Sequence, residues 1–378
     1  MTKTFKVGLI GLGYIGQVHA NAYQIIPLCF KKPAVTAHLA GVLRSKLNTE
    51  EALMDSLGFE VRTTDPEAFY AQRYDVVDIC SPNFLHLEQA RAAFEHGAHV
   101  YCEKPLALNL AEAREMAALA DAAGVRTQVA FVLRFLPAIR QMKALVEAGE
   151  IGEVFHFRGQ LLHGSYVNPA RPMSWRLRNA QSGGGAFADL GAHLIDMARY
   201  MLGDVESVRA EMRTFIDKRA APGGAKTFET VDVDDWALCT LQMAAGATGV
   251  IEAARMASGA PRVTSLALYG SKGSLVYEDS DPNHVRFFKV KTGRWSQGAL
   301  DITPEGERPI AAIWPSGKYT QGVMTDVHLA AIYDFLWNIA EDKPSGVDIH
   351  AGLAVQEVLE ASYRSAAQDG ARIKLPLS

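Results

Sequence analysis

A glycine-rich loop near the start of the chain restricts the fold more than any other feature of the sequence. The segment KVGLIGLGYIG, residues 6–16, is an apolar run that leads into three glycines spaced G-x-G-x-x-G. Such a run predicts a buried strand, and the residues after it predict a helix. In a strand–loop–helix unit, Gly11 would form the turn, Gly13 would let a pyrophosphate approach the backbone, and Gly16 would let the helix pack closely. The loop therefore predicts a dinucleotide site, with a plain tight turn as the alternative.

The first third of the chain alternates short apolar runs with amphipathic helical segments. Because parallel strands need crossover helices, this alternation predicts a doubly wound parallel sheet, the Rossmann arrangement. We expect the first domain to span residues 1–126. The strands of the sheet are expected at residues 6–10, 37–43, 76–80, 99–102 and 127–132.

Beyond this domain, apolar runs follow one another with short turns, which is typical of a mainly antiparallel sheet. The GSKG at 270–273 predicts a hairpin turn. Three helices are expected at residues 184–203, 325–340 and 348–368. The expected fold class is therefore α/β, with a Rossmann domain and a second, α+β domain over residues 127–378 that contains a large, mainly antiparallel sheet.

The composition restricts the partners and the location of the protein. The 378 residues include 38 basic and 42 acidic ones, a net charge of -4, so there is no basic field for nucleic acid or for an anionic membrane. The four cysteines are far apart and form no C-x-x-C pair, which is typical of reduced thiols. No apolar stretch is long enough to span a membrane, and the N-terminal residues lack the layout of a signal peptide. We expect a cytoplasmic protein.

A second motif, EKP at 103–105, directly follows a predicted strand. With its surroundings at 75–116 and with the segments 133–154, 184–203 and 352–377, it resembles the Gfo/Idh/MocA family of NAD(P)-dependent oxidoreductases. The resemblance implies hydride transfer between NAD(P) and a secondary hydroxyl or keto group of a sugar, anhydrosugar or cyclitol. Two alternatives remain on this scaffold: a glycosidase that uses NAD without net redox change, and a cofactor-binding regulator without catalysis.

The resemblance implies that Lys104, Asp189 and His193 form the catalytic group. Asp189 and His193 are four residues apart, so on a helix they share one face, with Asp196 close by. A histidine is suited to accept the hydroxyl proton, and a lysine ammonium can stabilise a developing alkoxide. A merely polar helix face is the alternative. The cluster has neither an H-E-x-x-H pattern nor a cysteine partner, so no metal is expected.

The cofactor is expected to contact the glycine loop, the end of the second strand, and the loops after the strands that end near residues 80 and 102. Ligands of open α/β sheets bind at such strand ends. The expected cofactor-binding residues are Gly11, Gly13, Tyr14, Ile15, Gly16, Arg44, Ser45, Ser81, Pro82, Asn83, His86, Glu103 and Lys104. For the loop that carries His86, a helix cap with local hydrogen bonds is the alternative. The resemblance also implies a cis peptide bond before Pro105.

The substrate is expected to meet a loop-like stretch at 163–179 and the segment around Arg134. The expected substrate-binding residues are Arg134, Tyr166, Trp175 and Arg176. The alternative for this stretch is a clamp on a surface loop. Three positions depart from the family pattern, because valine or leucine replaces asparagine or tyrosine at Val132, Leu133 and Leu136. The polar contacts made there by other members are therefore in doubt.

The choice between NAD and NADP depends on the end of the second strand. An NAD site usually places an acidic residue there, about 20 residues after the glycines. No acidic residue occurs from Gln17 to Thr49, and Arg44, Ser45 and Lys46 stand at the expected position. Because an arginine binds a 2′-phosphate and an acid repels it, the sequence favours NADP. Arg44 stacking on adenine or pointing to solvent is the alternative.

The second domain has few helices to cover its sheet. One face is therefore expected to stay open and to be buried in a homodimer or homotetramer. Alternating apolar residues are expected to form this surface: Ala237, Cys239, Leu241, Leu266 and Leu268.

Overall fold

The structure is a computed structural model that describes residues 2–47, 49–223, 227–260, 262–298, 300 and 302–377. The chain divides into two compact units. The first unit contains residues 1–107, 111–135 and 308–353. The second unit contains residues 108–110, 136–307 and 354–378.

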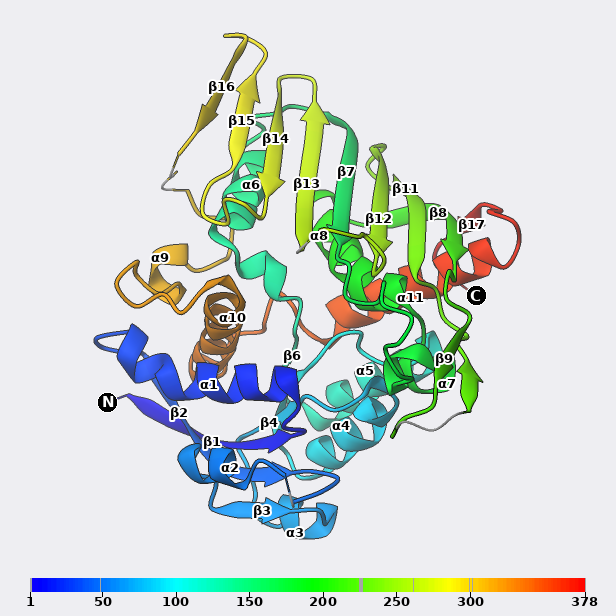
Figure 1. The fold of residues 1–378 in the computed structure, drawn as a ribbon. Helices are drawn as coiled ribbons and strands as arrows, with labels where there is room; N and C mark the ends of the chain where they lie inside the picture. The colour runs from blue at the N-terminus through cyan, green and yellow to red at the C-terminus, as the bar shows by residue number, and fades with distance from the viewer. Residues whose placement is uncertain are drawn as a thin grey trace. The chain divides into compact units, whose positions relative to one another are not determined.

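A parallel sheet forms the centre of the first unit (Figure 1). Within the described residues its strand order is β3-β2-β1-β4-β5-β6. Strands β2 and β3 lie on one side of β1, and the later strands β4, β5 and β6 lie on the other side. This leaves a switch point between β1 and β4, where ligands of open α/β sheets bind. The strands are β1 (Lys3–Ile10), β2 (Val35–Leu43), β3 (Val61–Thr63), β4 (Val76–Ile79), β5 (His99–Cys102) and β6 (Thr127–Val129).

The predicted parallel sheet is confirmed. Strands that are buried on both faces are rich in apolar residues, and largely apolar runs form the buried parts of β1, β4 and β5. Asp78, in β4, is a buried polar exception. The sequence missed β3, which has three half-buried residues, and the strand expected to reach residue 132 ends at Val129. The helices of this unit are α1 (Tyr14–Cys29), η1 (Asn83–Leu85), α2 (Glu51–Ser56), α3 (Pro66–Tyr70), α4 (His86–Glu95), α5 (Leu110–Ala123), η2 (Val132–Phe135), α9 (Ile310–Ile313) and α10 (Val323–Ala340).

Helix α10 belongs to the first unit although it lies near the end of the chain. It packs against α1, where the rings of Phe30 and Tyr333 stack at 4.2 Å. The side-chain amide of Gln128, in β6, donates to the backbone oxygen of Ala331 at 2.9 Å. The compact units therefore differ from the expected division at 126/127. Residues 127–135 and 308–353 join the first unit because β6 pairs with β5, and because α10 is buried on almost all sides.

The second unit is built on a large sheet whose described strands run in the order β16-β15-β14-β13-β7-β12-β11-β8-β17. Among these described neighbours, β7 and β12 are parallel and the other pairs are antiparallel, so the predicted, mainly antiparallel sheet is confirmed. The GSKG segment turns between β13 and β14, as predicted. The strands are β7 (Val154–Leu162), β8 (Val205–Arg213), β11 (Trp236–Met243), β12 (Thr248–Ala254), β13 (Val263–Gly270), β14 (Gly273–Glu278), β15 (Arg286–Lys289), β16 (Arg294–Gln297) and β17 (Ile373–Lys374).

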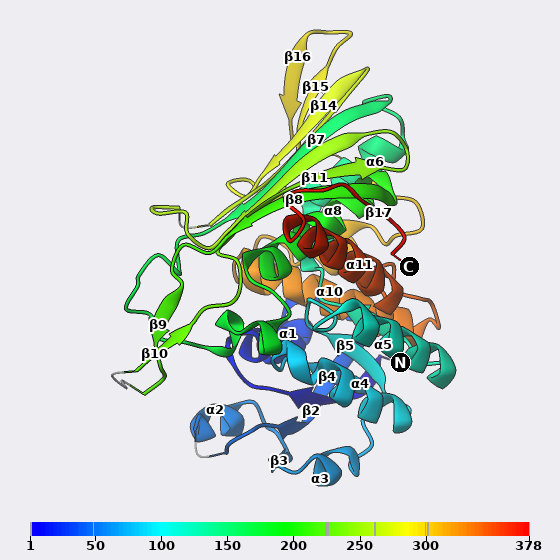
Figure 2. The same ribbon diagram turned by 90° about the vertical axis from the view of Figure 1, so that its right-hand side faces the viewer.

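A small hairpin and several helices complete this unit. Figure 2 shows α8 and α11 on the same side of the large sheet. The hairpin is β9 (Lys218–Ala220) with β10 (Phe228–Thr230), and the helices are α6 (Pro137–Glu147), η3 (Trp175–Leu177), α7 (Asn179–Ser182), the π-helical turn η4 (Phe187–Gly191), α8 (Ala192–Leu202) and α11 (Ile349–Ala366). Among the described residues, every helix is too short or too polar to cross a membrane.

The apolar residues expected on the open face of the sheet lie on its covered face, so this expectation was wrong. The Cys239 thiol lies 3.4 Å from the Ser362 hydroxyl of α11. Leu266 and the α8 residue Leu194 approach the same side of Gly159 in β7. The residues concerned are at most 1% exposed: Ala237, Cys239, Leu241, Leu266 and Leu268. The alternation in the sequence marks two faces of the sheet, but it does not say which face the helices cover.

Candidate active site

The glycine loop has the geometry that its spacing predicts. Gly11 has a φ of 87°, and a Cβ on it would lie 2.9 Å from the backbone oxygen of Cys80. A Cβ on Gly16 would lie 2.1 Å from the backbone oxygen of Gly11. Gly13 precedes α1, caps it without a side chain and faces open space. The N–H groups at the start of α1 are therefore accessible to a phosphate, which fits a dinucleotide cofactor.

The other residues expected at the cofactor lie at the carboxyl ends of β1, β2, β4 and β5. Tyr14 and Ile15 begin α1, and Tyr14 is exposed. Ser81 and Pro82 follow β4, and the buried Asn83 begins η1. These positions agree with the expected binding edge of the sheet.

His86 connects two of these loops. Its Nε2 lies 3.1 Å from the Ser81 backbone oxygen, and its Nδ1 lies 3.2 Å from the backbone oxygens of Pro105 and Leu106. The ring is buried, and this burial lowers the pKa of His86. These contacts fit the alternative of local hydrogen bonding. They hold the loop after β4 against the EKP segment, in which the bond between Lys104 and Pro105 is cis, as the resemblance implied.

The carboxylate of Glu103, in the EKP segment, contacts other residues of the first unit. Its Oε1 lies 3.3 Å from His19 Nε2, and its Oε2 accepts the backbone N–H of Lys104 at 3.1 Å. His19 Nδ1 lies 3.0 Å from Asp78 Oδ2. Burial opposes both charges, yet Asp78 raises the pKa of His19 well above its ordinary value, and His19 with Lys104 lowers the pKa of Glu103 to about 2.

His19 and Asp78 were missed by the sequence reasoning, because His19 lies on the buried face of α1 and Asp78 lies in the buried strand β4. A polar residue at such a position is itself a signal, since a buried charge needs a partner. Two sets of side chains here have the spacing of metal ligands: His19 with Glu103 and His328, and His19 with Asp78 and Cys80. Both ring nitrogens of His19 already lie within 3.3 Å of a carboxylate oxygen, so an imidazolium between two carboxylates accounts for the cluster.

Arg44, which directly follows β2, is bonded to an acidic residue that the sequence reasoning did not consider, Glu50 at the start of α2. Arg44 Nη2 donates to Glu50 Oε2 at 2.6 Å, and Arg44 Nη1 donates to the backbone oxygen of Thr49 at 2.7 Å. The side-chain amide of Gln17 donates both to Glu50 Oε1 at 3.0 Å and to the backbone oxygen of Leu12, in the glycine loop. Ser45 is exposed. Arg44 is thus paired with the Glu50 carboxylate, and the Gln17 side chain links that carboxylate to the glycine loop.

In the second unit, Asp189 and His193 lie on one helix, which we call the Asp189 helix and which comprises η4 and α8. Asp189 lies in the π-helical turn and its side chain is 26% exposed, whereas His193, in the first turn of α8, is buried. A π-turn is a wide turn that often occurs at functional sites. The opposite face packs into the core, as predicted, through Phe187, Leu190, Leu194 and Met201.

Arg255 forms an ion pair with Asp189. No motif in the sequence pointed to Arg255. It follows β12 directly, its side chain is 1% exposed, and its Nη2 lies 3.1 Å from Asp189 Oδ2. Its Nη1 donates to the backbone oxygen of Arg176 at 3.3 Å. One buried guanidinium therefore joins the partly exposed Asp189 carboxylate to the stretch that was expected to meet the substrate.

That stretch, residues 163–179, packs into a small apolar cluster. The buried members of the cluster are Tyr166, Met173, Leu177, Val231 and Val233. Tyr166 is buried, and the guanidinium carbons of Arg171 and Arg255 lie 4.1 and 4.9 Å from its ring centre. The buried Arg219, in β9, donates to the backbone oxygen of Tyr166 at 2.6 Å. The Arg176 guanidinium lies 4.3 Å from the ring centre of Trp175.

The remaining expected residues lie in the first unit or in the core. Arg134, in η2, donates to the backbone oxygen of Gly346 at 2.9 Å. Val132, Leu133 and Leu136 are buried, which agrees with the doubt about polar contacts at these positions. Lys104 belongs to the first unit, whereas Asp189 and His193 belong to the second.

Comparison with known families matches two parts of the chain. Residues 5–131 match the oxidoreductase family with an NAD-binding Rossmann fold, and residues 139–276 match the GFO/IDH/MocA C-terminal domain. A similar protein is levoglucosan dehydrogenase of Pseudarthrobacter phenanthrenivorans, which is 33% identical over 97% of each chain. D-glucoside 3-dehydrogenase of Escherichia coli is 28% identical over 99% of this chain and 98% of its own.

Solved structures agree with these matches over the whole chain. A levoglucosan dehydrogenase in complex with NADH and levoglucosan has a TM-score of 0.89 and 30% identity, and the alignment covers 99% of this chain and 100% of the other. An NAD binding oxidoreductase from Klebsiella pneumoniae has a TM-score of 0.89 and 32% identity, with the same coverage.

Proposed function

Since this chain belongs to the GFO/IDH/MocA family of oxidoreductases, we propose that Lys104, Asp189 and His193 are its catalytic residues. The protein is an enzyme that transfers a hydride between NAD(H) and a secondary hydroxyl or keto group of a sugar, anhydrosugar or cyclitol. The observation that supports the catalytic proposal best is the Asp189 carboxylate, which is partly exposed beside His193 and held by a buried arginine.

In the proposed mechanism, His193 accepts the proton of the substrate hydroxyl, since an imidazole is suited to exchange protons near neutral pH. Asp189 orients that imidazole and balances its charge, and Arg255 restricts the direction of the Asp189 carboxylate. The Lys104 ammonium stabilises the negative charge that develops on the substrate oxygen. NAD, when bound, supplies the hydride acceptor.

An anhydrosugar is the first substrate to test. The support is the 33% identity to a levoglucosan dehydrogenase over nearly the whole chain, together with a solved complex of such an enzyme with levoglucosan. We propose levoglucosan, with D-glucosides and inositols as the runners-up that other relatives suggest. A panel of these compounds with each nicotinamide, followed by the absorbance of the reduced cofactor, identifies the substrate. Release of a cleaved sugar without net reduced cofactor would instead indicate the redox-neutral glycosidase.

Two variants test the catalytic residues. We expect Lys104→Ala and His193→Ala each to lose about 10²- to 10⁴-fold in kcat with the best substrate, because a positioned acid, base or charge is removed from the reacting oxygen. Both should still bind NADH, measured by the fluorescence of the bound cofactor. Near-normal turnover in either variant would refute its assigned role. A wild-type protein that binds NADH but turns over no compound of the panel would instead indicate the non-catalytic regulator.

For the cofactor, we propose NAD rather than the NADP that Arg44 suggested. The support is the ion pair between Arg44 and Glu50, because a carboxylate repels a 2′-phosphate and accepts a hydrogen bond from a ribose 2′-hydroxyl. Glu50 lies next to Gln17, whose amide also bonds to the glycine loop.

We further propose a homodimer or homotetramer that forms on the face of the large sheet opposite α8 and α11. On that face Leu238, Val250 and Ala267 remain half-buried in the single chain. The four cysteines are free and buried, which supports a reducing, cytoplasmic location.

A further inference from the structure

A run of glycines precedes the Asp189 helix, which has no capping side chain of its own. The first N–H groups of a helix have no partner within the helix and must be satisfied from elsewhere. Asp234, which precedes β11, satisfies three of them. Gly185 N–H donates to Asp234 Oδ1 at 2.9 Å, and Phe187 N–H donates to Asp234 Oδ2 at 2.7 Å. Ala186 N–H donates to the Asp234 backbone oxygen at 2.8 Å.

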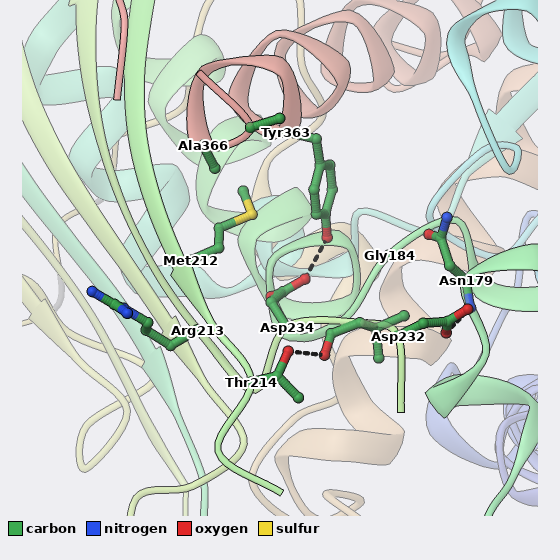
Figure 3. A pocket seen from close by; sticks show the side chains of 11 residues that line it. Asn179, Gly184, Met212, Arg213, Thr214, Asp232, Asp234, Tyr363 and Ala366 are labelled. Atoms are coloured by element: carbon green, nitrogen blue, oxygen red, sulfur yellow. Dashed lines mark hydrogen bonds between the residues drawn. The ribbon is translucent and has the colours of Figure 1, made fainter. Parts of the chain in front are cut away.

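Tyr363, from α11, completes the set. Its hydroxyl oxygen accepts the N–H of Ala188 at 3.2 Å and that of Gly185 at 3.0 Å, and the hydroxyl donates to Asp234 Oδ1 at 2.8 Å (Figure 3). Burial and the neighbouring Asp234 raise the pKa of Tyr363, so it keeps the proton that it donates. Two residues that are 49 and 178 positions from Gly185 thus accept the N–H groups of residues 185–188, at the start of the helix and just before it.

The glycine run makes this approach sterically feasible. A Cβ on Gly184 would lie 2.2 Å from the Tyr363 hydroxyl oxygen, and a Cβ on Gly185 would lie 1.9 Å from the Asp234 backbone oxygen. Gly184 also has a φ of 153°. These distances explain why the residues before the helix are glycines.

The π-turn that contains Asp189 starts within this anchored segment. If the helix started one residue earlier or later, the side chains after that point would turn by about 100° around the helix axis. Such a rotation would move Asp189 away from Arg255 and change the direction of His193.

We propose that Asp234 and Tyr363 are positioning residues, which set the start of the Asp189 helix and thereby aim Asp189 and His193 at the substrate. The inference rests on the proposed catalytic roles of those two residues. It assigns neither Asp234 nor Tyr363 any contact with the substrate.

A cavity of about 290 Å³ lies beside the pair and gives access to it. Asp234, Tyr363, Thr214 and the exposed Asp232 contribute to its lining (Figure 3). Asp232 Oδ1 accepts the N–H of Asn179, in α7, at 2.6 Å. Asp232 is therefore an aspartate on the same cavity that caps a different helix, and it provides a matched control.

The test compares Asp234→Ala, Tyr363→Phe and the control Asp232→Ala. We expect Asp234→Ala to lose on the order of 10²-fold in kcat and Tyr363→Phe about tenfold, with KM nearly unchanged, as a small misplacement of catalytic groups can do. Hydrogen exchange of the amides at 185–188 should accelerate in both variants. Formate should restore part of the kcat of Asp234→Ala, because the anion can enter from the cavity and accept the same N–H groups. Asp232→Ala should have the kcat of the wild type and the same exchange at 185–188, and formate should not change its kcat.

The failure of this inference differs from that of the proposed function. Wild-type kcat and unchanged exchange at 185–188 in both variants, while His193→Ala is inactive, would overturn the positioning role and leave the catalytic assignment intact. Full activity of His193→Ala would overturn the assignment on which it rests. If Asp234→Ala does not fold in a thermal melt, Tyr363→Phe carries the test, since it keeps the ring and loses one hydroxyl.

Discussion

The imidazole of His19 lies between two buried carboxylates, and none of the three charges would be stable there without the others. Because Glu103 also accepts the backbone N–H of Lys104, this charge network fixes the segment that carries the proposed catalytic lysine. The contribution of this network to the stability of the fold depends on pH at an acid limit and at an alkaline limit. Glu103 stabilises the fold above the pKa of the unfolded chain, 4.5, and this stabilisation is lost as the pH falls toward 2. His19 stabilises the fold below 6.5, and this is lost only as the pH rises through its raised pKa.

We expect His19→Gln to lower the free energy of unfolding by about 3 kcal/mol or more at pH 7, because it leaves two buried carboxylates without their cation. The difference from the wild type should shrink at acid pH, because the stabilisation that Glu103 gains from His19 is lost as the pH falls from 4.5 toward 2. Urea unfolding at pH 7 and pH 4 measures both values. His38→Gln is the control, since it removes an exposed histidine that lies 2.9 Å from Glu60. An equal loss at the two pH values would contradict the assignment of charge.

Glu50 and Arg44 give a second prediction for single residues. If Glu50 repels the 2′-phosphate, Glu50→Gln should raise kcat/KM with NADP relative to NAD by about tenfold, whereas Arg44→Ala should leave a preference for NAD. The measurement is the ratio of kcat/KM for the two cofactors in the wild type and in each variant. A wild-type enzyme that prefers NADP and loses this preference in Arg44→Ala would support the original expectation from the sequence instead.

Among the elements of the second unit, the 163–179 stretch is bonded by two buried arginines with different roles. Arg255 bonds to both elements, whereas Arg219 bonds to backbone oxygens of the stretch alone. The two side chains therefore have separate roles: Arg255 positions the proposed catalytic carboxylate, and Arg219 shapes the proposed substrate-binding stretch.

We expect Arg255→Met to lower kcat by about 10²-fold, since Asp189 loses its ion-pair partner and its direction. Arg219→Met should mainly raise KM, because the stretch loses its anchor while Asp189 keeps Arg255. Steady-state kinetics with the identified substrate gives both constants, and thermal melts show whether each variant is folded. A folded Arg255→Met enzyme with wild-type kcat would show that Asp189 does not depend on this arginine.

The elements also show how far the sequence could lead. Continuous apolar runs predicted the parallel strands, and the i, i+4 spacing brought Asp189 and His193 onto one helix. The sequence could not say which face of the large sheet is covered, because Cys239 and its neighbours alternate in the same way for either face. It pointed to neither Arg255 nor Asp234, because each acts through a contact distant in sequence. Glu50 was missed since it lies one residue beyond the stretch considered.

At the scale of the whole molecule, the composition of the uncovered sheet face bears on assembly. Across that face, the cross-strand neighbours in order are Thr240, Val250, Arg158 and Ala267. Apolar and polar residues are therefore mixed on it. A surface of this kind suits an interface with polar contacts rather than one continuous apolar core.

We expect the wild type to have the mass of a dimer or tetramer in light scattering at micromolar concentration. Val250→Arg should weaken the assembly and lower the mass, because it places a second cation beside Arg158. Lys374→Ala, at the far edge of the sheet in β17, is the control and should leave the mass unchanged. A strictly monomeric wild type would contradict the proposed assembly.

The late return of the chain to its first unit has a consequence for synthesis on the ribosome. Phe335 packs its ring 5.7 Å from Tyr101, and His328 lies 4.8 Å from His19, yet about two hundred residues separate the first 135 from this helix. A nascent chain that has passed β6 therefore still lacks the helix that contacts Tyr101 and His19 in the folded unit. The first unit therefore cannot finish folding before the second is synthesised. Its residues 308–353 leave the ribosome only after residues 136–307, which form most of the second unit.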